Sequence, residues 1–441
     1  MTSESYEKAL KYHSQYPVGK ISTVVTKPAE TQEDLSLAYS PGVAGPCLAI
    51  KTNPDDSYTY TWRTNTIAVV SDGSAVLGLG DIGAYAAMPV MEGKALLFKK
   101  FAGIDGIPLC LDKTCDERGN TCVNALVETI ERLEPSFGGI NLEDIKAPYC
   151  FEVEKILREK MQIPVLHDDQ HGTAVIVLAA LYNALELAQK KIDDITIVIN
   201  GAGAAGIATA HFLLQAGVSR LNLFVCDSLG IIYQGRDSGM NEYKEAIAVE
   251  THKKTLDDAL RGADVFIGVS QGNILHKAMV QTMAQDPIIF ALANPVPEIS
   301  YEQAKKAGAF IVGTGRSDFP NQVNNVLGFP GIFRGALDCR ARRITESMKV
   351  AVSKALASLA REPFPDDIKN ILLHAYPNEE QLFESAMPLG TDYVIPKPLD
   401  PRVVPRVARY VVEQAMKEGV ARIMIEDLDA YEKQVRERVI S

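Results

Sequence analysis

Short apolar runs alternate with helical patterns through the second half of the chain. From Ile195 onward the apolar runs fall at 195–199, 221–226, 264–269, 288–293 and 310–313. Segments with helical character lie between most of them, at 204–216, 242–249, 276–284 and 301–307. Alternation of this kind predicts a parallel sheet whose faces are covered by helices.

The first half and the tail follow less regular patterns. Ahead of Ile195, the sequence predicts strands at 67–70 and 107–112 and helices at 5–16, 86–98, 120–134, 149–157 and 174–187. The last of these helices is apolar on most sides, as a buried helix is. Beyond residue 326, helices are expected at 344–360 and 403–419, with a stiff proline-rich connector at 395–401.

The strand at 195–199 runs directly into a glycine-rich turn that is followed by a helix. Strand, G-x-G-x-x-G turn and helix in this order are typical of a dinucleotide site, because small residues let the pyrophosphate approach the N–H groups at the helix N-terminus. The residues expected to line the site are Gly201, Gly203, Ala204, Ala205 and Gly206. We therefore expect a doubly wound, Rossmann-type sheet that binds NAD or NADP.

Residues at the ends of two later strands bear on whether NAD or NADP binds and on where the dinucleotide lies. Asp227 ends the next strand, 26 residues after Gly201 (227 − 201), in the position that accepts ribose hydroxyls. An acid there favours NAD because it repels a 2′-phosphate, whereas Arg236 nearby is compatible with NADP, so both cofactors stay open. Asn294 follows the strand at 288–293 and is expected to face the same crevice.

A second glycine-rich run, residues 78–83, also matches G-x-G-x-x-G. It follows a short apolar run and precedes a helix. However, no apolar strand ending in an acid comes some 20 residues later, as a dinucleotide site requires. We expect this run to be a turn that lines a cleft.

Two acidic pairs, Glu143-Asp144 and Asp168-Asp169, lie at the ends of short apolar runs and just ahead of helices. Carboxylates at strand ends can meet across a cleft, where their mutual repulsion requires a cation. Hard oxygen donors suit Mg²⁺ or Mn²⁺ rather than zinc. The alternative interpretation is structural, with the first pair capping a helix and the second forming a solvated turn.

Lys94 and Tyr39 are candidates for proton transfer. Lys94 lies in the largely apolar helix at 86–98, and a lysine in such surroundings near carboxylates can have its proton affinity tuned for base work. The alternative is a surface lysine whose stem lies along apolar side chains. Tyr39 precedes Ser40-Pro41-Gly42, where the chain bends sharply, and a tyrosine at a bend can also serve packing alone.

Composition excludes several classes of protein. The chain has 441 residues, 46% of them hydrophobic, a formal net charge of −11 and no run of Lys or Arg, so we expect neither nucleic-acid nor membrane partners. Its seven cysteines are scattered, and Cys110, Cys115 and Cys122 lack zinc-site spacing, which favours a reduced, cytoplasmic protein. The N-terminus lacks the apolar core of a signal peptide, and the longest apolar run, 174–182, is too short to span a bilayer.

These motifs together resemble those of the malic enzyme family in its short bacterial form. They occur in the family's order and span nearly the whole chain. The matching segments are 38–44, 76–83, 92–98, 141–145, 167–174, 200–206, 293–295, 321–325 and 393–402.

The resemblance implies oxidative decarboxylation of L-malate to pyruvate and CO₂ with reduction of NAD⁺ or NADP⁺. Lys94 would remove the proton of the C2 hydroxyl, with Asp168 close beside it, and Tyr39 would protonate C3 of the enol. The implied ligands of Mg²⁺ or Mn²⁺ are Glu143, Asp144 and Asp169. The implied substrate contacts are Asn294 and Asn325, with Asn294 also near the cofactor.

The resemblance also implies three parts of the chain. These are an N-terminal α/β substrate domain at 1–165, a Rossmann domain for NAD(P) at 166–325, and a C-terminal helical segment at 326–441. The helical segment is expected to pack back on the N-terminal lobe and join the two domains. Short-form relatives are homodimers, in which Tyr39 or Lys94 could act across the interface.

The chain departs from the family pattern at Ala75, where longer members have an arginine that holds the substrate carboxylate. Some bacterial relatives carry a C-terminal phosphotransacetylase-like domain; because this chain ends at Ser441, we expect no regulation by such a domain. Four alternative functions stay open: a malolactic enzyme, an oxaloacetate decarboxylase, a two-lobed amino-acid dehydrogenase, and a non-catalytic NAD(P)-sensing protein.

Overall fold

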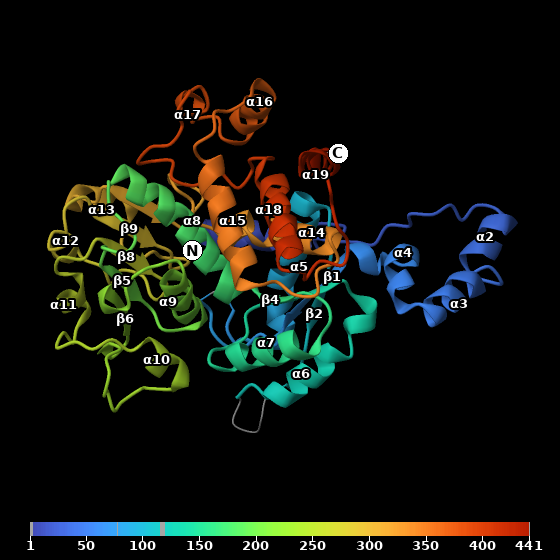
Figure 1. The fold of residues 1–441 in the computed structure, drawn as a ribbon, viewed down its shortest axis with the longest axis horizontal. Coiled ribbons are helices and arrows are strands. Elements are labelled where there is room, and N and C mark those ends of the chain that lie inside the picture. Colours follow the sequence, from blue (N-terminus) through green and yellow to red (C-terminus); the bar gives the residue numbers. More distant parts are fainter. Residues whose placement is uncertain (1–2, 77, 115–119, 441) are drawn as a thin grey trace.

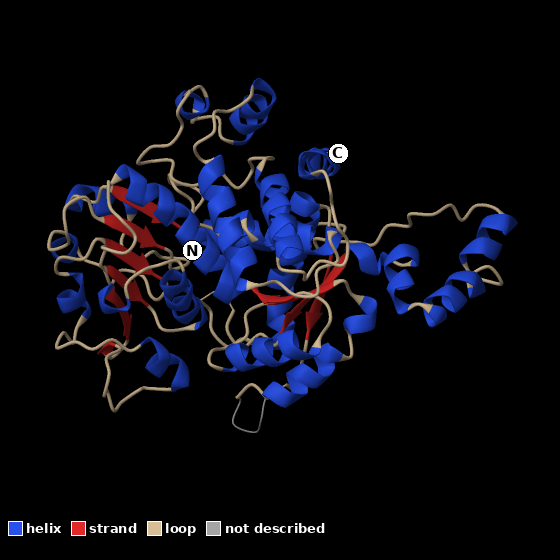
Figure 2. Cartoon of the chain, in the orientation of Figure 1, coloured by secondary structure: helices blue, strands red, loops and turns tan. Residues whose placement is uncertain are grey.

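Two sheets organise the chain, and each belongs to its own lobe (Figure 1 and Figure 2). The structure is a computed structural model and describes residues 3–76, 78–114 and 120–440. Leu77, in the second glycine-rich run, and Cys115 lie outside these ranges. The predicted α/β class, a doubly wound sheet beside an N-terminal α/β lobe, is confirmed.

The N-terminal lobe is built on four parallel strands in the order β2-β1-β3-β4. Their bounds are β1 Thr66–Ser71, β2 Asp105–Cys110, β3 Gly139–Leu142 and β4 Val165–His167. Three helices cover this sheet: α5 Gly83–Ala102, α6 Val123–Glu131 and α7 Tyr149–Lys160. Alternate residues of β1 pack in different clusters, Val69 with Phe98 of α5 and Val70 with Leu126 of α6, so both faces of the sheet are buried.

The second lobe contains six strands in the order β10-β9-β8-β5-β6-β7. Their bounds are β5 Ile197–Asn200, β6 Leu223–Asp227, β7 Gly230–Ile231, β8 Val265–Gly268, β9 Ile288–Ala291 and β10 Ile311–Thr314. All neighbouring pairs are parallel except the short β6–β7 hairpin. The order reverses beside β5, and ligands bind at such a switch point in open α/β sheets.

Short helices alternate with these strands, as the apolar periodicity predicted. They are α9 Ala204–Gln215, α10 Glu242–Ile247, α11 Leu256–Leu260, α12 Lys277–Val280 and α13 Tyr301–Ala307. Five 3₁₀ turns occur among the described residues, at Pro54–Asp56, Trp62–Asn65, Glu134–Ser136, Arg220–Asn222 and Asn325–Leu327.

The long helix α8, Asp168–Leu187, links the two lobes and is buried along most of its length. Sequence patterns placed its start after Thr173, and this was wrong, because the helix begins at Asp168 and includes Gly172. A side chain at Gly172 would meet Asp168 Oδ1 at 2.3 Å and the Asn325 amide at 2.9 Å. The glycine therefore reflects close packing inside the helix rather than a turn.

The C-terminal segment packs against α5 of the N-terminal lobe and against α8. Its helices are α14 Phe329–Asp338, α15 Glu346–Leu359, α16 Asp366–Ala375, α17 Glu380–Phe383, α18 Val403–Lys417 and α19 Leu428–Ile440. Phe98 of α5 makes edge contacts with Phe329 and Phe333 of α14, at centroid distances of 4.7 and 5.4 Å. The segment also reaches α8, where the Asn183 amide donates to the backbone oxygens of Ala357 and Val394.

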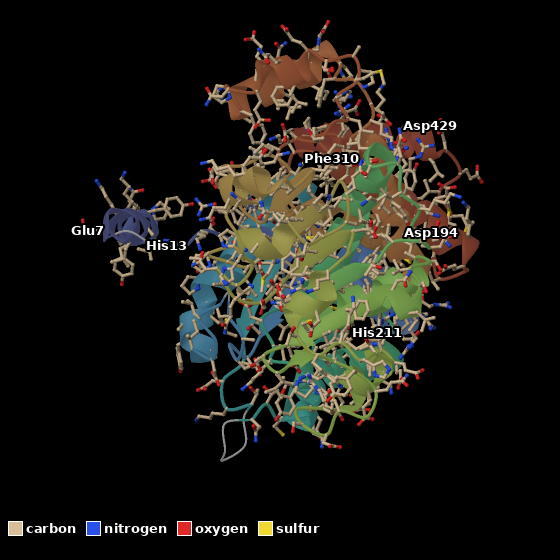
Figure 3. All side chains as sticks on the ribbon, turned by 90° about the vertical axis from the view of Figure 1, so that its left-hand side faces the viewer. Glu7, His13, Asp194, His211, Phe310 and Asp429 are labelled. Atoms are coloured by element: carbon tan, nitrogen blue, oxygen red, sulfur yellow. The ribbon has the colours of Figure 1, made fainter. Side chains whose placement is uncertain are left out.

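Most of the N-terminal segment stands away from both lobes, but Ser57 and Tyr58 of its last helix are buried, and the Lys20 N–H donates to Glu92 of α5 at 3.2 Å. Its helices are α1 Ser3–Ser14, α2 Gln32–Ala38, α3 Ala44–Thr52 and α4 Ser57–Tyr60. In Figure 1, α2 and α3 project from the side of the N-terminal lobe, and Figure 3 shows α1, with Glu7 and His13, separated from the main body. No residue of α2 or α3 is buried.

None of the helices in the described part of the chain combines the length and apolar character needed to cross a bilayer.

Candidate functional site

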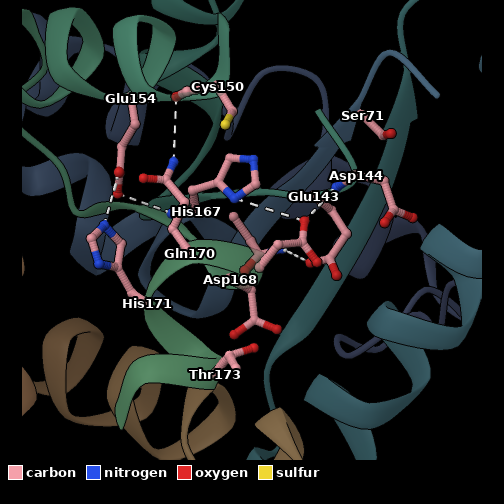
Figure 4. Close-up of polar contacts among 12 residues, drawn as sticks. Ser71, Glu143, Asp144, Cys150, Glu154, His167, Asp168, Gln170, His171 and Thr173 are labelled. Carbon is pink, nitrogen blue, oxygen red and sulfur yellow. Dashed lines mark hydrogen bonds and ion pairs between the residues drawn. The ribbon is translucent and has the colours of Figure 1, made fainter. Parts of the chain in front are cut away.

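The two acidic pairs meet at one edge of the N-terminal sheet. Strands β3 and β4 are parallel neighbours, with Leu142 opposite His167, so the acids that follow each strand emerge side by side (Figure 4). Glu143, Asp144 and Asp169 each present a carboxylate oxygen, and these three oxygens lie within 4.8 Å of one another. Glu143 and Asp144 are buried, and Asp169 is partly exposed.

Local structure fixes these carboxylates. Asp144 has a left-handed backbone, with φ of 54°, which is uncommon outside glycine but tolerated by aspartate. Its backbone N–H donates to Asp169 Oδ2 at 2.7 Å. The Asn141 amide donates to Glu143 Oε2 at 2.8 Å. The turn after β3 and the first turn of α8 are thus held together before any ligand binds.

The site is electrostatically poised for a cation. Burial raises the pKa of Glu143, and the neighbouring carboxylates of Asp169, Asp168 and Asp144 raise it further against the opposing effect of Lys94. A divalent cation would relieve this repulsion, and three carboxylates are the donor set that Mg²⁺ or Mn²⁺ prefers. The residues therefore fit such an ion, and the alternative of a solvated turn is wrong for Asp168, which is fully buried.

Lys94, on helix α5, contacts the acidic cluster formed by Glu143, Asp144, Asp168 and Asp169. Its Nζ lies 2.7 Å from Asp168 Oδ2 and 2.9 Å from Glu143 Oε1, and 4.2 Å from the centre of the Phe329 ring. These contacts exclude the alternative that Lys94 is a surface lysine. Burial alone would lower the pKa of Lys94, but the carboxylates of Asp168 and Glu143 outweigh it and raise the pKa. Without a cation in the cluster, Lys94 is therefore a protonated partner of these acids.

Of the two predicted substrate asparagines, one lies in the cluster. The Asn325 amide is 3.3 Å from Asp168 Oδ2, and its oxygen accepts a hydrogen bond from Thr173 Oγ1 at 3.2 Å. Asn294 lies just past the end of β9 and is exposed. A side chain at Gly78 would come within 2.7 Å of the Asn294 backbone oxygen, so the second glycine-rich run approaches the other lobe there.

Tyr39 is not brought to the cluster within one chain. It ends helix α2 in the projecting N-terminal segment, and 78% of its surface is exposed. The sharp bend expected at Ser40-Pro41-Gly42 is present. Packing within the chain does not account for this tyrosine.

The glycine-rich turn after β5 forms part of a cavity of about 740 Å³. Gly201 has φ of +125°, and a side chain at Gly206 would lie 1.8 Å from the Gly201 backbone oxygen, so both positions require glycine. A side chain at Gly203 would meet no atom within 4 Å, which leaves room for a pyrophosphate beside the first turn of α9, formed by Ala204 and Ala205.

Asp227 lines this cavity, but its carboxylate is already engaged. Arg236 binds both of its oxygens, Lys244 Nζ lies 2.7 Å from Oδ2, and the Leu229 N–H donates to Oδ1 at 2.9 Å. Burial would raise the pKa of Asp227, yet these hydrogen bonds hold it at about 2. The expected contact with ribose hydroxyls therefore competes with two cationic partners.

A buried polar chain behind the acids was not predicted from the sequence. Glu154 of α7 accepts from the His167 N–H at 3.1 Å and from His171 Nε2 at 2.8 Å (Figure 4). Lys349 Nζ lies 2.8 Å from His171 Nδ1 and 2.7 Å from Glu346. Because the lysine donates to Nδ1, the proton of a neutral His171 is on Nε2 and points to Glu154. His171 follows the acids within one motif, whereas nothing in the sequence marked Lys349.

Replacing Glu154 with glutamine is expected to weaken Mn²⁺ binding by about tenfold or more, as loss of an outer hydrogen-bond partner of a metal site does. Glu154 accepts from His167 with Oε1 and from His171 with Oε2, and glutamine would place an NH₂ donor opposite one of them, so the junction between β4 and α8 shifts. Titration calorimetry with Mn²⁺ measures the effect. Glu159→Gln, on the same helix and exposed, is the control. Equal Mn²⁺ affinity in both variants would show that Glu154 has no positioning role.

Comparisons with known proteins agree along the chain. Residues 18–158 match the family described as malic enzyme, N-terminal domain, and residues 170–387 match malic enzyme, NAD binding domain. The chain is 52% identical over 439 residues to the NADP-dependent malic enzyme of Rhizobium meliloti, covering 99% of this chain and 56% of that protein. It is 51% identical to the bifunctional malic/malolactic enzyme of Bacillus subtilis, covering 97% of each.

A solved structure shows the same similarity to malic enzymes. The malic enzyme from Pyrococcus horikoshii superposes with a TM-score of 0.87 at 44% identity, covering 99% of this chain and 96% of that one. The chain spans about half the length of several curated relatives, including the Rhizobium meliloti protein.

Proposed function

The chain belongs to the malic enzyme family, and from this premise we propose that it oxidatively decarboxylates L-malate to pyruvate and CO₂ while reducing NAD⁺ or NADP⁺. One observation carries the proposal. The carboxylates of Glu143, Asp144 and Asp169 lie within 4.8 Å of one another, with Lys94 in direct contact with Glu143.

Glu143, Asp144 and Asp169 would hold Mg²⁺ or Mn²⁺. When bound, such an ion would polarise the C2 oxygen of malate and stabilise the negative charge left by departing CO₂. Lys94 would then face carboxylates whose charge is largely compensated, which lowers its pKa from the raised value of the metal-free cluster. The lysine is thus converted from an ion-pair partner into a base only when the site is loaded.

Lys94 would take the proton of the C2 hydroxyl, and a bound nicotinamide would supply the acceptor for the hydride of C2. Asp168 holds the Lys94 amine through its 2.7 Å contact and is itself held by Asn325 at 3.3 Å. Asn325 is placed to orient the substrate hydroxyl, and Asn294 lies on the side of the second lobe, where a substrate carboxylate and the nicotinamide would meet. The protonated amine would give the proton to the enolate oxygen left by decarboxylation, and would take it back as C3 is protonated and the enol becomes pyruvate.

Tyr39 would supply the proton at C3 from a partner subunit of a homodimer. Its segment is exposed and carries apolar side chains with no cover in the chain, among them Leu35, Leu37 and Leu48. Large exposed apolar surface of this kind marks an interface. A second copy of the chain is an occupant that would also explain why Tyr39 lies away from Lys94.

Mixing two inactive variants tests this arrangement. Subunits with Tyr39→Phe and subunits with Lys94→Ala, unfolded and refolded together in equal amounts, are expected to recover roughly a quarter of wild-type activity, because half of the dimers then contain one complete site. Malate-dependent NAD(P)H formation is the measurement. No recovery in a refolded mixture, when wild type recovers under the same treatment, would contradict a shared site.

Cofactor choice depends on Lys244. Because Arg236 and Lys244 neutralise Asp227, the repulsion of a 2′-phosphate is removed, and we predict that NADP⁺ is accepted alongside NAD⁺. Lys244→Ala is expected to lower the NADP⁺/NAD⁺ ratio of kcat/KM by about tenfold, since a charged hydrogen bond to the phosphate is lost. Lys306→Ala, exposed on α13, is the control. An unchanged ratio would assign the choice to other residues.

A malolactic reaction is the second candidate, because a relative of equal length has the printed name of a bifunctional malic/malolactic enzyme. It would use the same acids and Lys94, as would decarboxylation of added oxaloacetate. Net NAD(P)H release separates the malolactic reaction, which produces lactate and shows none.

One assay tests the proposed function. Malate with Mn²⁺ is supplied with NAD⁺ and with NADP⁺ in parallel, and NAD(P)H, pyruvate and lactate are measured. Pyruvate and NAD(P)H in equal amounts, abolished by EDTA, are expected. Activity on amino acids that survives EDTA would favour an amino-acid dehydrogenase, and cofactor binding without any turnover would favour a sensing protein.

A further inference from the structure

A cavity of about 700 Å³ opens between the lobes, behind the helix that begins with the acidic pair. Its walls come from three parts of the chain. Helix α7 lines the cavity on the side of the N-terminal lobe, and α9 lines it on the side of the second lobe. The segment before α15 contributes Arg342 and Arg343. The cavity is therefore separate from the dinucleotide cavity, with which it shares no lining residue.

The lining has an excess of uncommitted positive charge. The side chains of Lys155, Arg342 and Arg343 make no ion pair or hydrogen bond with any residue in the described ranges. Arg158, also in the lining, donates to the Ile344 backbone oxygen and keeps only a 3.5 Å contact with Glu346. Unpaired cations that converge on a concave surface attract anions.

The carboxylates that line the cavity are already paired with other side chains of the protein, with one exception. Glu154 is bound by His171, and Glu346 is bound by Lys349 at 2.7 Å. Only Glu159 has no partner among the residues that the structure describes. Three free cations thus face one free carboxylate, so an anionic ligand would complete the charge balance that the protein leaves open.

The cavity is also preformed. Phe151 of α7 and Tyr243 of α10 contact each other across the two lobes with ring centroids 4.4 Å apart, and both line the cavity. Glu154 and His171 line its inner side, and the hydrogen bonds between them and from Lys349 to His171 fix their positions. A ligand would thus enter a cavity with a fixed inner wall, whose lining also includes the exposed side chains of Arg342 and Arg343.

We propose that this inter-lobe cavity is a binding site for a small organic polyanion, recognised through carboxylate or phosphate groups by Arg342, Arg343 and Lys155. Arginine pairs bind both groups through parallel N–H donors. Because the three cations come from α7 and from the C-terminal segment, a bound anion ties these two parts together and stabilises the folded chain. The site does not depend on the proposed malate chemistry.

Citrate and inorganic pyrophosphate serve as probes for the two kinds of anionic group. Each is titrated calorimetrically into the full chain in EDTA, without malate or nicotinamide cofactor, and the melting temperature is followed in parallel. We expect at least one probe to bind with Kd of about 1 mM or tighter and to raise the melting temperature. Binding of citrate alone indicates a carboxylate ligand, and binding of pyrophosphate alone indicates a phosphate ligand.

Variants separate this site from the dinucleotide cavity and from general charge. The double variant Arg342→Gln/Arg343→Gln is expected to bind about tenfold more weakly or worse. Arg132→Gln/Arg261→Gln, which removes two exposed arginines elsewhere, is the matched control and should bind as wild type does. Lys155→Gln, on helix α7, provides a second test if the arginine variant fails to fold.

No binding of either probe to the wild-type chain would overturn the proposal. Equal binding by wild type and the cavity variants would do so as well, because the anion would then lie elsewhere. An equal loss in the control would show a general effect of charge and would also overturn it. Failure of the malate assay alone leaves these binding results unaffected, so the two proposals fail separately.

Discussion

Replacing Lys94 with alanine is expected to lower kcat for malate oxidation by about 10²–10⁴-fold, the range that a positioned general acid or base supplies. Among the described residues no other amine is paired with Glu143 or Asp168, and the His167 ring lies instead beside Asp169, with its Nδ1 3.7 Å from Asp169 Oδ2. The loss should be in kcat more than in KM, since the proton is transferred only as hydride leaves. Steady-state kinetics with saturating Mn²⁺ measure it.

A matched control lies on the same helix. Lys99 is exposed and pairs only with Asp105 near the end of α5, so Lys99→Ala should keep wild-type turnover. Lys94→Ala should still bind NAD⁺ or NADP⁺ with unchanged affinity, because the dinucleotide cavity has none of its atoms. Wild-type turnover in Lys94→Ala would remove the lysine from the mechanism.

Replacing Asp169 with alanine is expected to raise the Mn²⁺ concentration for half-maximal activity by about 100-fold or more. The residue supplies one of three carboxylates and also accepts the Asp144 N–H, so its loss removes a ligand and releases a second one. Outer partners of a metal site alone contribute 10–100-fold, which sets the lower bound. At high Mn²⁺ much of the activity should return, because Lys94 and Asp168 remain in contact.

The control for this variant is Asp193→Ala, on the exposed loop after α8. It should leave the Mn²⁺ requirement unchanged. A normal Mn²⁺ requirement in Asp169→Ala, or a loss of activity that no concentration of Mn²⁺ restores, would contradict the assigned role of this carboxylate as one ligand among three.

The parts of the fold that sequence could predict are those set by local pattern. Apolar runs of four to six residues separated by helical segments predicted the second sheet, because parallel strands buried on both faces are near-continuous apolar runs. Gly201 and Gly206 indicated the dinucleotide turn because backbone contacts at these positions leave no space for a side chain. The acidic pairs were informative because each ends a strand.

The residues that sequence missed act over long separations. Lys349 lies 178 positions from His171, and no local pattern announces their 2.8 Å contact. The engagement of Asp227 by Lys244 also depends on the path of a loop. For Lys94, sequence predicted the neighbouring carboxylates but not their net effect, which raises the pKa because three acids outweigh burial.

Tyr39 shows a different limit. Sequence placed it at a bend, and the bend is present, but a single chain leaves the tyrosine exposed on a projecting segment. In the proposed homodimer the contacts of Tyr39 come from the second copy of the chain, so a single folded chain does not contain them. The mixed-subunit experiment addresses this residue directly.

The most direct test of the metal site is anomalous diffraction from crystals of the protein grown with Mn²⁺. A single strong peak is predicted between the carboxylates of Glu143, Asp144 and Asp169, within coordination distance of all three and close to the Lys94 amine. A peak at another position, or none at this cluster when Mn²⁺ is saturating for activity, would show that these acids do not hold the ion and would contradict the proposed chemistry.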